Sequence, residues 1–198
     1  MHLGKKFVLV MAASAAPAIA IPNAQARTTG IPLAGQAVPL PPMTHPPGDI
    51  PDTQVFITYH SPLGFSIKTP EGWARRSTAA GVGFRSQYDA MAISVGSAAA
   101  PPTAASARDN QAAALMKSPA AVLISKVEAV GTPAGPAVRI VYASNSAPNP
   151  VTGKAIRLED EQYLFWDNGR LATLTLSAPY GADNVDQWRL ISRSFRWH

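Results

Sequence analysis

The chain has 198 residues, a formal net charge of +5 and no cysteine. The length corresponds to one domain once processed or unstructured ends are removed. The lack of cysteine excludes disulfides, thiolate metal sites, cysteine nucleophiles and a lipid-modified cysteine. Such a domain has to be stabilised by apolar burial alone, for which about 145 residues are enough.

The first residues are organised like a secretory signal peptide. Two lysines precede a mainly apolar run over 7–21, and Ala24 and Ala26 are the small residues after which a signal peptidase cuts. We therefore predict a signal peptide over 1–26 and a mature chain that begins at Arg27.

A membrane anchor is the alternative for this segment. The apolar run has 15 residues and is interrupted by Pro17, whereas roughly 20 apolar residues are needed to cross a bilayer. We therefore expect no integral membrane span after processing. Export of a chain without cysteine fits a bacterial periplasm or exterior.

The charge of the mature chain is only weakly basic, with 15 basic and 12 acidic residues and a net charge of +3. The densest basic groups are the pair Arg75 and Arg76 and the triplet Arg189, Arg193 and Arg196. Nucleic-acid-binding domains gather basic residues on one face among aromatic residues. We therefore expect no nucleic-acid partner and interpret these arginines as solvated surface.

The segment over 27–53 contains seven prolines and three glycines and has no periodic apolar pattern. Such a composition resists helix and sheet and favours extended polyproline conformation. We predict a disordered Pro-rich linker that holds a single folded domain, over 54–198, away from a surface. A ligand for a proline-recognising partner is the alternative.

The folded part opens with alternating apolar residues that predict two strands, Val55 to Tyr59 and Phe65 to Ile67, across the turn "SPLG". In "TPEGW" the proline cannot donate a strand hydrogen bond and Gly72 permits a turn, so the second strand ends there. Trp73 then folds back as an apolar cap on the sheet edge.

A partner or ligand contact at this corner is the functional alternative to a purely structural one. The candidate contact residues are Trp73, Tyr59, His60, Arg75 and Arg76.

Two further strands meet at "YDA", the first containing Val82, Phe84 and Tyr88 and the second running from Met91 to Val95. A helix over 107–117 follows, with Ser106 as its cap and Asp109 near its positive end.

Strands are then expected over 122–130 and 137–143. Asn168 and Gly169 in "YLFWDNGRLATLTLS" predict a two-residue hairpin, because both positions tolerate positive φ. After this turn, apolar residues alternate with Thr173, Thr175 and Ser177, so one face of the strand is solvent-exposed or polar.

A closing helix is predicted from "ADNVDQWRLISRSF", with Asp183 as its cap and Val185, Trp188 and Ile191 at helical spacing. We interpret Trp188 as a core residue, with ligand stacking as the alternative. The predicted fold is therefore α+β, with a mostly antiparallel sheet of about six to eight strands flanked by helices.

The strand pair ending in "GFSIKTPEGW", the central helix, the hairpin and the closing helix ending in "ISRSF" resemble the PsbP-like family of α/β/α sandwich domains. The resemblance extends from about Val55 to Trp197. That family includes bacterial envelope proteins of the LpqN type. The resemblance implies a non-catalytic binding or assembly module and supplies no catalytic residues.

The acidic triplet Glu159, Asp160 and Glu161 is a candidate for a divalent cation site. Strand alternation argues against it, since Glu159 and Glu161 share a face on which like charges are most simply solvated. Asp160 falls in phase with apolar residues, so either a β-bulge lies near it or its carboxylate is buried and paired. We favour the bulge.

The histidines of the mature chain are His45, His60 and His198, and no pair has metal-ligand spacing. We expect no cofactor and no enzymatic activity. The predicted function is an exported binding or assembly accessory protein of the bacterial envelope, with another envelope protein as partner. The alternative is a carrier of a small apolar ligand in a cavity between sheet and helices. A hydrolase would have to recruit His60 or His198, and the test is whether His60 lies within reach of a serine and an acid in one cleft.

Overall fold

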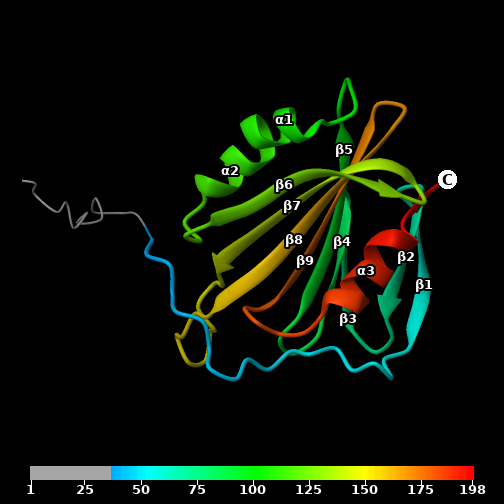
Figure 1. The fold of residues 1–198 in the computed structure, drawn as a ribbon. Coiled ribbons are helices and arrows are strands. Elements are labelled where there is room, and N and C mark those ends of the chain that lie inside the picture. The colour runs from blue at the N-terminus through cyan, green and yellow to red at the C-terminus, as the bar shows by residue number, and fades with distance from the viewer. Residues whose placement is uncertain (1–36) are drawn as a thin grey trace, which may run out of the picture. The chain divides into compact units, whose positions relative to one another are not determined.

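The computed structural model describes residues 37–198, so the predicted signal peptide lies outside the described residues. A seven-stranded sheet, in which neighbouring strands are antiparallel, forms the body of the fold (Figure 1). Its spatial order is β3 (Ala74–Thr78), β4 (Gly81–Arg85), β5 (Ala90–Ser97), β9 (Arg170–Pro179), β8 (Arg157–Asp167), β7 (Gly135–Asn145) and β6 (Leu123–Thr132).

A second sheet has three antiparallel strands, with β2 in the middle. They are β1 (Phe56–Ser61), β2 (Phe65–Pro70) and β10 (Arg196–Trp197). The predicted α+β class with a mostly antiparallel sheet is confirmed. The sequence pattern did not predict β3, whose five residues are all exposed, or the two-residue β10.

The first helical segment consists of α1 (Ala104–Ala107), a π-helical turn (Arg108–Ala112) and α2 (Ala113–Met116). Its cap differs from the predicted one. Thr103 Oγ1 accepts a hydrogen bond from Ser106 N at 3.1 Å, and Ser106 Oγ accepts one from Thr103 N at 2.9 Å. Ser106 is therefore the inner residue of a capping box that begins at Thr103.

The closing helix α3 (Val185–Ser194) begins after Asn184, not after the predicted cap Asp183. Trp188 and Ile191 are buried as expected, whereas Val185 is 64% exposed. Because the side chain of Asn184 binds elsewhere, α3 has no side-chain cap hydrogen bond.

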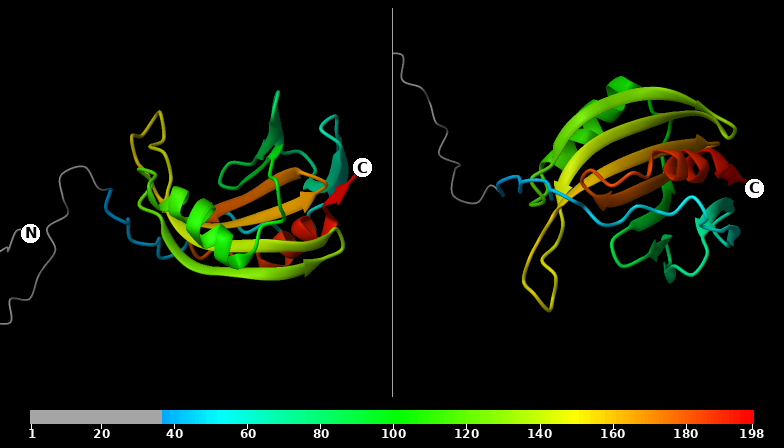
Figure 2. Two further views of the ribbon diagram at one scale, coloured as in Figure 1. Left: turned by 90° about the horizontal axis from the view of Figure 1, so that it is seen from above. Right: turned by 60° about the horizontal axis from the view of Figure 1, so that its bottom comes forward.

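Two layers cover opposite faces of the main sheet, as Figure 2 shows from two sides. Helices α1 and α2 pack on one face over β6 and β7. Helix α3 and the three-stranded sheet pack on the other face, where three aromatic rings fill the space. Phe165 and Phe195 stack with centroids 4.3 Å apart, and Phe65 stacks on Phe195 at 5.6 Å.

Two turns confirm the interpretation of the sequence. Asn168 and Gly169 have φ values of +46° and +82° and join β8 to β9. Gly72 has a φ of +85° in the turn between β2 and β3. Trp73, which follows it, is partly buried against the core.

Residues 37–53, which we call the N-terminal strap, differ from the predicted linker (Figure 1). They form no helix or strand, as their prolines suggest, but they are anchored to the fold. Ile50 is 4% exposed and belongs to the core on the α3 face. The expectation of a disordered linker is therefore wrong for this part, and residues 27–36 lie outside the described chain.

Two asparagine side chains hold the strap by bonding its backbone. Asn145 accepts a hydrogen bond from Leu40 N at 3.0 Å and donates one to the Val38 carbonyl at 2.8 Å. Asn184 accepts from Ile50 N at 2.7 Å and donates to the Gly48 carbonyl at 2.9 Å. Each amide thus satisfies one backbone donor and one backbone acceptor that a polyproline-like segment cannot pair internally.

Within residues 37–198, no helix is long and apolar enough to cross a membrane.

Candidate functional site

The five contact residues predicted from the sequence do not form one site. Tyr59 packs edge-on against Phe84 at 5.2 Å, and the Arg75 guanidinium lies 5.6 Å from the centroid of the Tyr59 ring. Trp73 is partly buried against the same core. These three residues therefore support the corner between β1, β3 and β4 through packing.

His60 and Arg76 lie away from that corner because strand alternation turns them to the opposite sides of β1 and β3. His60 stacks on His198 with ring centroids 5.9 Å apart. Arg76 is exposed and lies opposite Gly83 across the β3–β4 pair. The structure thus separates His60 and Arg76 from Tyr59.

An uncovered surface lies on the main sheet, on the face opposite α3. Helices α1 and α2 contact β6 and β7, and Leu171 at the start of β9 packs against the same cluster. Within residues 37–198, β4, β5 and the rest of β9 have no covering helix on this face. The side chains on this part of the sheet are small, and Ala92 and Ser94 are exposed. We call this surface the open face; it comprises Gly83, Ala90, Ala92, Ser94, Thr173, Thr175 and Ser177.

The cross-strand register makes the open face continuous. Ser94 lies opposite Thr173, Ala92 opposite Thr175, and Ala90 opposite Ser177. The sequence had indicated the polar side of β9, because threonine and serine alternate there with apolar residues. It could not indicate that β5 adds a matching row of small residues, since that pairing joins segments about 80 residues apart.

A groove of about 560 Å³ lies at one end of the open face. Ala90 and Ser177 belong to its floor, and Tyr88 and the 146–156 loop form its walls. Two exposed cations, Arg85 and Lys154, line it. Among the residues that the structure describes, no carboxylate lines the groove, so it favours a polar or acidic occupant.

Asp160 lies beside this end of the face, as the cross-strand neighbour of Ser177 on β8, and is 3% exposed. Ser144 donates a hydrogen bond to its carboxylate at 2.6 Å, and Ser177 donates a second. The register of β8 with both neighbouring strands is continuous at this position, so the favoured β-bulge is wrong. The buried and paired alternative is correct.

The environment of this carboxyl group is unusual for an aspartate. Burial raises the pKa of Asp160, and the hydroxyls of Ser144 and Ser177 only partly offset the effect. Burial and the nearby Asp160 charge also raise the pKa of Tyr142. The Asp160 carboxylate is held by its two serine partners, one of which, Ser177, lines the groove.

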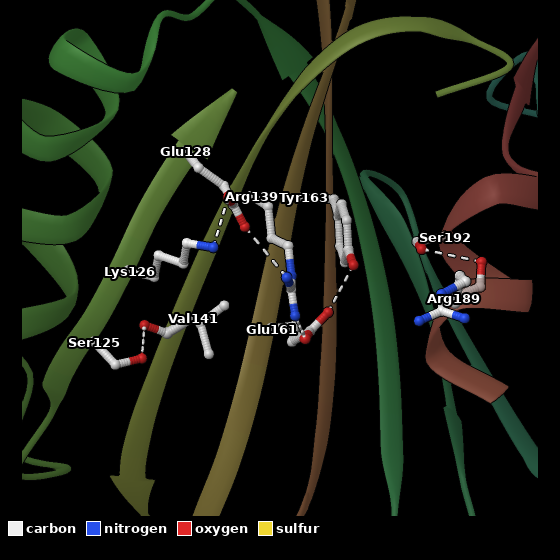
Figure 3. A network of polar contacts seen from close by, with 9 residues as sticks. All are labelled: Ser125, Lys126, Glu128, Arg139, Val141, Glu161, Tyr163, Arg189 and Ser192. Carbon is white, nitrogen blue, oxygen red and sulfur yellow. Dashed lines mark hydrogen bonds and ion pairs between the residues drawn. The ribbon is translucent and has the colours of Figure 1, made fainter. Parts of the chain in front are cut away.

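The opposite face carries a charged network that crosses three strands (Figure 3). Arg139 bonds Glu128 at 3.2 Å and also pairs with Glu161. Tyr163 donates to Glu161 at 2.6 Å, and burial together with this bond raises the pKa of Tyr163 to about 12. Lys126 completes the network with a 2.8 Å ion pair to Glu128.

This network corrects the expectation that Glu161 is solvated. Glu161 is only 8% exposed, and Arg139 and Tyr163 each donate a hydrogen bond to one of its two carboxylate oxygens. Asp160 projects to the other face and is bonded by two serines. Across residues 37–198, no group of three or more His, Asp or Glu side chains is placed to hold a metal ion.

A serine contacts His198, one of the two histidines that a hydrolase would have to use. Ser66 Oγ lies 2.8 Å from His198 Nε2. No carboxylate within the described chain bonds this imidazole, and Ser66 is only 5% exposed. The arrangement therefore lacks both the orienting acid and the accessible nucleophile of a serine hydrolase.

No protein-family model matches the chain, and no curated protein matches it by sequence. Among solved structures, the fold is similar to the solution structure of cyanobacterial PsbP (CyanoP) from Synechocystis sp. PCC 6803. The identity is 13%, the TM-score is 0.55, and the alignment covers 76% of this chain and 98% of that one. The chain therefore has a PsbP-like fold, as its sequence suggested.

Two further solved structures align less closely. The Ran-binding protein Mog1p from Saccharomyces cerevisiae has 10% identity and a TM-score of 0.47, with 73% of this chain and 96% of that one covered. A Pseudomonas aeruginosa protein of unknown function has 14% identity and a TM-score of 0.44, with 70% and 94% covered. At these scores the alignments carry no functional argument.

Proposed function

We propose that this chain is an exported, non-catalytic binding or assembly accessory protein of the bacterial envelope. The observation that supports this function best is the open face, a continuous surface of small residues, four of them with hydroxyl groups, that no other element of the described chain covers. Its partner in this proposal is another envelope protein, and the resemblance to LpqN-type envelope proteins belongs to the same proposal.

The side chains of the open face fit a binding surface that also has to be stable in water. A sheet face left uncovered would attract other chains if it were apolar. Small polar groups avoid this and let a partner approach closely. Arg76 and Arg85 lie on the side of β3 and β4 that continues the open face, so the partner should present acidic groups there.

Binding at the surface is favoured over the alternative of an apolar carrier. A carrier needs a deep cavity between sheet and helices. The stacked rings of Phe65, Phe165 and Phe195 fill the space between the main sheet and α3. A pocket of about 350 Å³ lies under the strap beside Pro39 and Leu40, but Arg157 and Glu159 also line it. Another, of about 520 Å³, lies between the α1–α2 segment and β6, where Arg108 and Lys126 line it.

Export is supported by the order of basic, apolar and small residues in positions 1–26. Mass spectrometry of the exported species should therefore find an amino terminus near Arg27. Recovery of exported protein that still begins at Met1 would contradict processing at this site.

The binding surface can be tested by substitutions that add bulk and charge to exposed strand positions. Ser94→Arg and Thr175→Arg should each abolish capture of the partner from envelope extract. The partner is identified by quantitative mass spectrometry of cross-linked complexes. The same partner should also be displaced by raised salt if acidic groups face Arg76 and Arg85.

Ala129→Arg is the matched control. Ala129 is exposed and lies in the cross-strand row of Ser94, but at the opposite edge of the sheet on β6. It should retain capture. Equal capture by all three variants would show that the open face is not the binding surface.

A further inference from the structure

A second pocket, of about 420 Å³, lies where the end of α3 meets the three-stranded sheet. It is separate from the open face and plays no part in the function proposed above. Its lining residues carry hydroxyl groups or positive charges, with one exposed leucine: Thr58, Ser66, Lys68, Leu190, Arg193, Ser194 and Arg196.

The fold brings these residues together from two distant segments. Across the strands, Thr58 lies opposite Lys68, and Ser66 lies opposite Arg196. Helix α3 is tied to β2 at the same place, because Ser194 Oγ accepts a hydrogen bond from Lys68 N at 2.7 Å. Figure 1 shows the red end of α3 beside β2.

The charge of the pocket is of one sign. Lys68, Arg193 and Arg196 are exposed, and no carboxylate is among the lining residues. None of the ion pairs in the described chain includes these three side chains. The sequence grouped Arg193 and Arg196 with a solvated surface, but it could not place Lys68, which is 125 residues from Arg193, beside them.

The arginines are oriented by backbone carbonyls. Arg196 Nη1 donates to the carbonyls of Arg193 at 2.9 Å and Phe195 at 2.6 Å, and Arg193 Nη1 contacts the Gly131 carbonyl at 3.5 Å. Each guanidinium carries five N–H donors, so further donors are free of these bonds. Their remaining edges can therefore bind an oxyanion.

Capping of the helix explains only part of this arrangement. Positive side chains are favoured at the C-terminal end of a helix, where the last carbonyls lack partners. That accounts for Arg196 and favours Arg193. It does not account for Lys68, which is on a strand and adds a third like charge to the same pocket.

We propose that this pocket binds a phosphate-type oxyanion group, with Lys68, Arg193 and Arg196 neutralising the charge and the hydroxyl of Thr58 donating to one of its oxygens. Guanidinium groups match the geometry of phosphate oxygens, and an ammonium adds a point charge. A dianion bound here would also relieve the mutual repulsion of the three cations. The phosphate can belong to a lipid headgroup or to a soluble phosphate ester.

The first arm of the test measures binding of inorganic phosphate and glycerol phosphate to the full mature chain by calorimetry at low salt. Wild-type protein should bind, and Lys68→Gln and Arg193→Gln should each weaken binding by about 10-fold or more, since hydrogen bonds to charged groups contribute about 1.5–3 kcal/mol. Binding should also weaken as the salt concentration rises.

The second arm uses vesicles of phosphatidylcholine with and without phosphatidic acid. Binding to the acidic vesicles alone, lost in Lys68→Gln, assigns the phosphate to a lipid headgroup. Binding of the soluble phosphates, with no preference for acidic vesicles, assigns it to a soluble ester.

Arg189→Gln is the matched control in both arms. Arg189 is an exposed arginine on the same helix, and it pairs with Asp186 at 3.1 Å. It should bind like the wild type, and thermal melts should show that all variants are folded. The proposal is overturned if wild type binds neither phosphates nor acidic vesicles, or if Lys68→Gln and Arg193→Gln bind as well as Arg189→Gln. Thr175→Arg should bind phosphate normally, so failure here is distinguishable from failure of the open face.

Discussion

The two faces of the main sheet are built from the same strands but differ in what covers them. On the α3 face, Ile93, Leu174 and Leu176 are at most 1% exposed. On the other face, their neighbours Ser94 and Thr175 are exposed or partly exposed. Strand alternation thus lets β5 and β9 stabilise the fold with one side and present a polar surface with the other.

The two faces of the main sheet also differ in how many elements of the chain cover them. The α3 face has three separate covering elements, namely α3, the three-stranded sheet and the strap. The opposite face has the single helical segment of α1 and α2, which reaches β6 and β7. Stability should therefore be concentrated on the α3 face, and substitutions there should have the largest effects.

The largest effect is expected for Phe195→Ala. Phe195 is fully buried and stacks on both Phe65 and Phe165, so its removal leaves a cavity between α3 and the sheet. The free energy of unfolding should fall by about 3–5 kcal/mol. Denaturant titration measures this change.

Tyr88→Ala is the control for loss of an aromatic ring. Tyr88 is 44% exposed at the groove of the open face, so its removal should change stability by about 0.5 kcal/mol or less. Similar losses in the two variants would contradict the contrast between the faces.

The second largest effect is expected for the strap. Ile50→Ala should lower the free energy of unfolding by about 2–5 kcal/mol, because the side chain is 4% exposed in the core of the α3 face. Val38→Ala, at a position that is 60% exposed, is the control and should have little effect. If Ile50→Ala melts like the wild type, the strap behaves as the detached linker that its prolines suggested.

Features set by neighbouring residues could be predicted from the sequence. The hairpin at Asn168 and Gly169 follows from their local conformational preferences, and the polar side of β9 follows from its alternation. The predicted sheet and the two helical segments rest on the same kind of local pattern. β10 was missed because a two-residue strand carries no period.

Features set by contacts between distant segments could not be predicted. The strap is held by Asn145 and Asn184, whose hydrogen bonds reach across more than 100 residues, and proline composition says nothing about them. The burial of Asp160 depends on Ser144 and Ser177 from two other strands. The pocket between α3 and the three-stranded sheet depends on the contact of Lys68 with the end of α3.

A smaller effect, dependent on pH, is expected for Asp160→Asn. Burial raises the pKa of Asp160 above its ordinary value of 3.8, so this group takes up a proton more readily in the folded protein than in the unfolded chain. The contribution of Asp160 to the free energy of unfolding is therefore most favourable at a pH below 3.8. It is lost as the pH rises from 3.8 through the higher pKa of the folded protein. The asparagine variant cannot ionise and should lack this loss.

The measurement is the difference in free energy of unfolding between wild type and Asp160→Asn, followed from acidic to neutral pH. The variant should gain relative to the wild type as the pH rises. Asp89, whose pKa is also raised by burial, is present in both proteins and cancels in the difference. A difference that does not change with pH would show that the Asp160 carboxyl is not perturbed.

The smallest effect on stability is expected for Ser94→Arg, and this variant tests the contrast between the faces most directly. Ser94 is exposed on the open face, while Ile93, the preceding residue in β5, is 1% exposed on the α3 face. Ile93→Ala should lower the free energy of unfolding by about 2–5 kcal/mol because it leaves a cavity, whereas Ser94→Arg should change it by about 0.5 kcal/mol or less.

Capture of the envelope partner should show the reverse order. Ser94→Arg adds bulk and charge to the binding surface, while Ile93→Ala leaves that surface intact in the molecules that remain folded. Denaturant titration and capture at a temperature where both variants are folded give the two measurements. If Ser94→Arg unfolds as easily as Ile93→Ala, the open face is part of the stabilising core. The two faces of β5 would then not divide stability and binding between them.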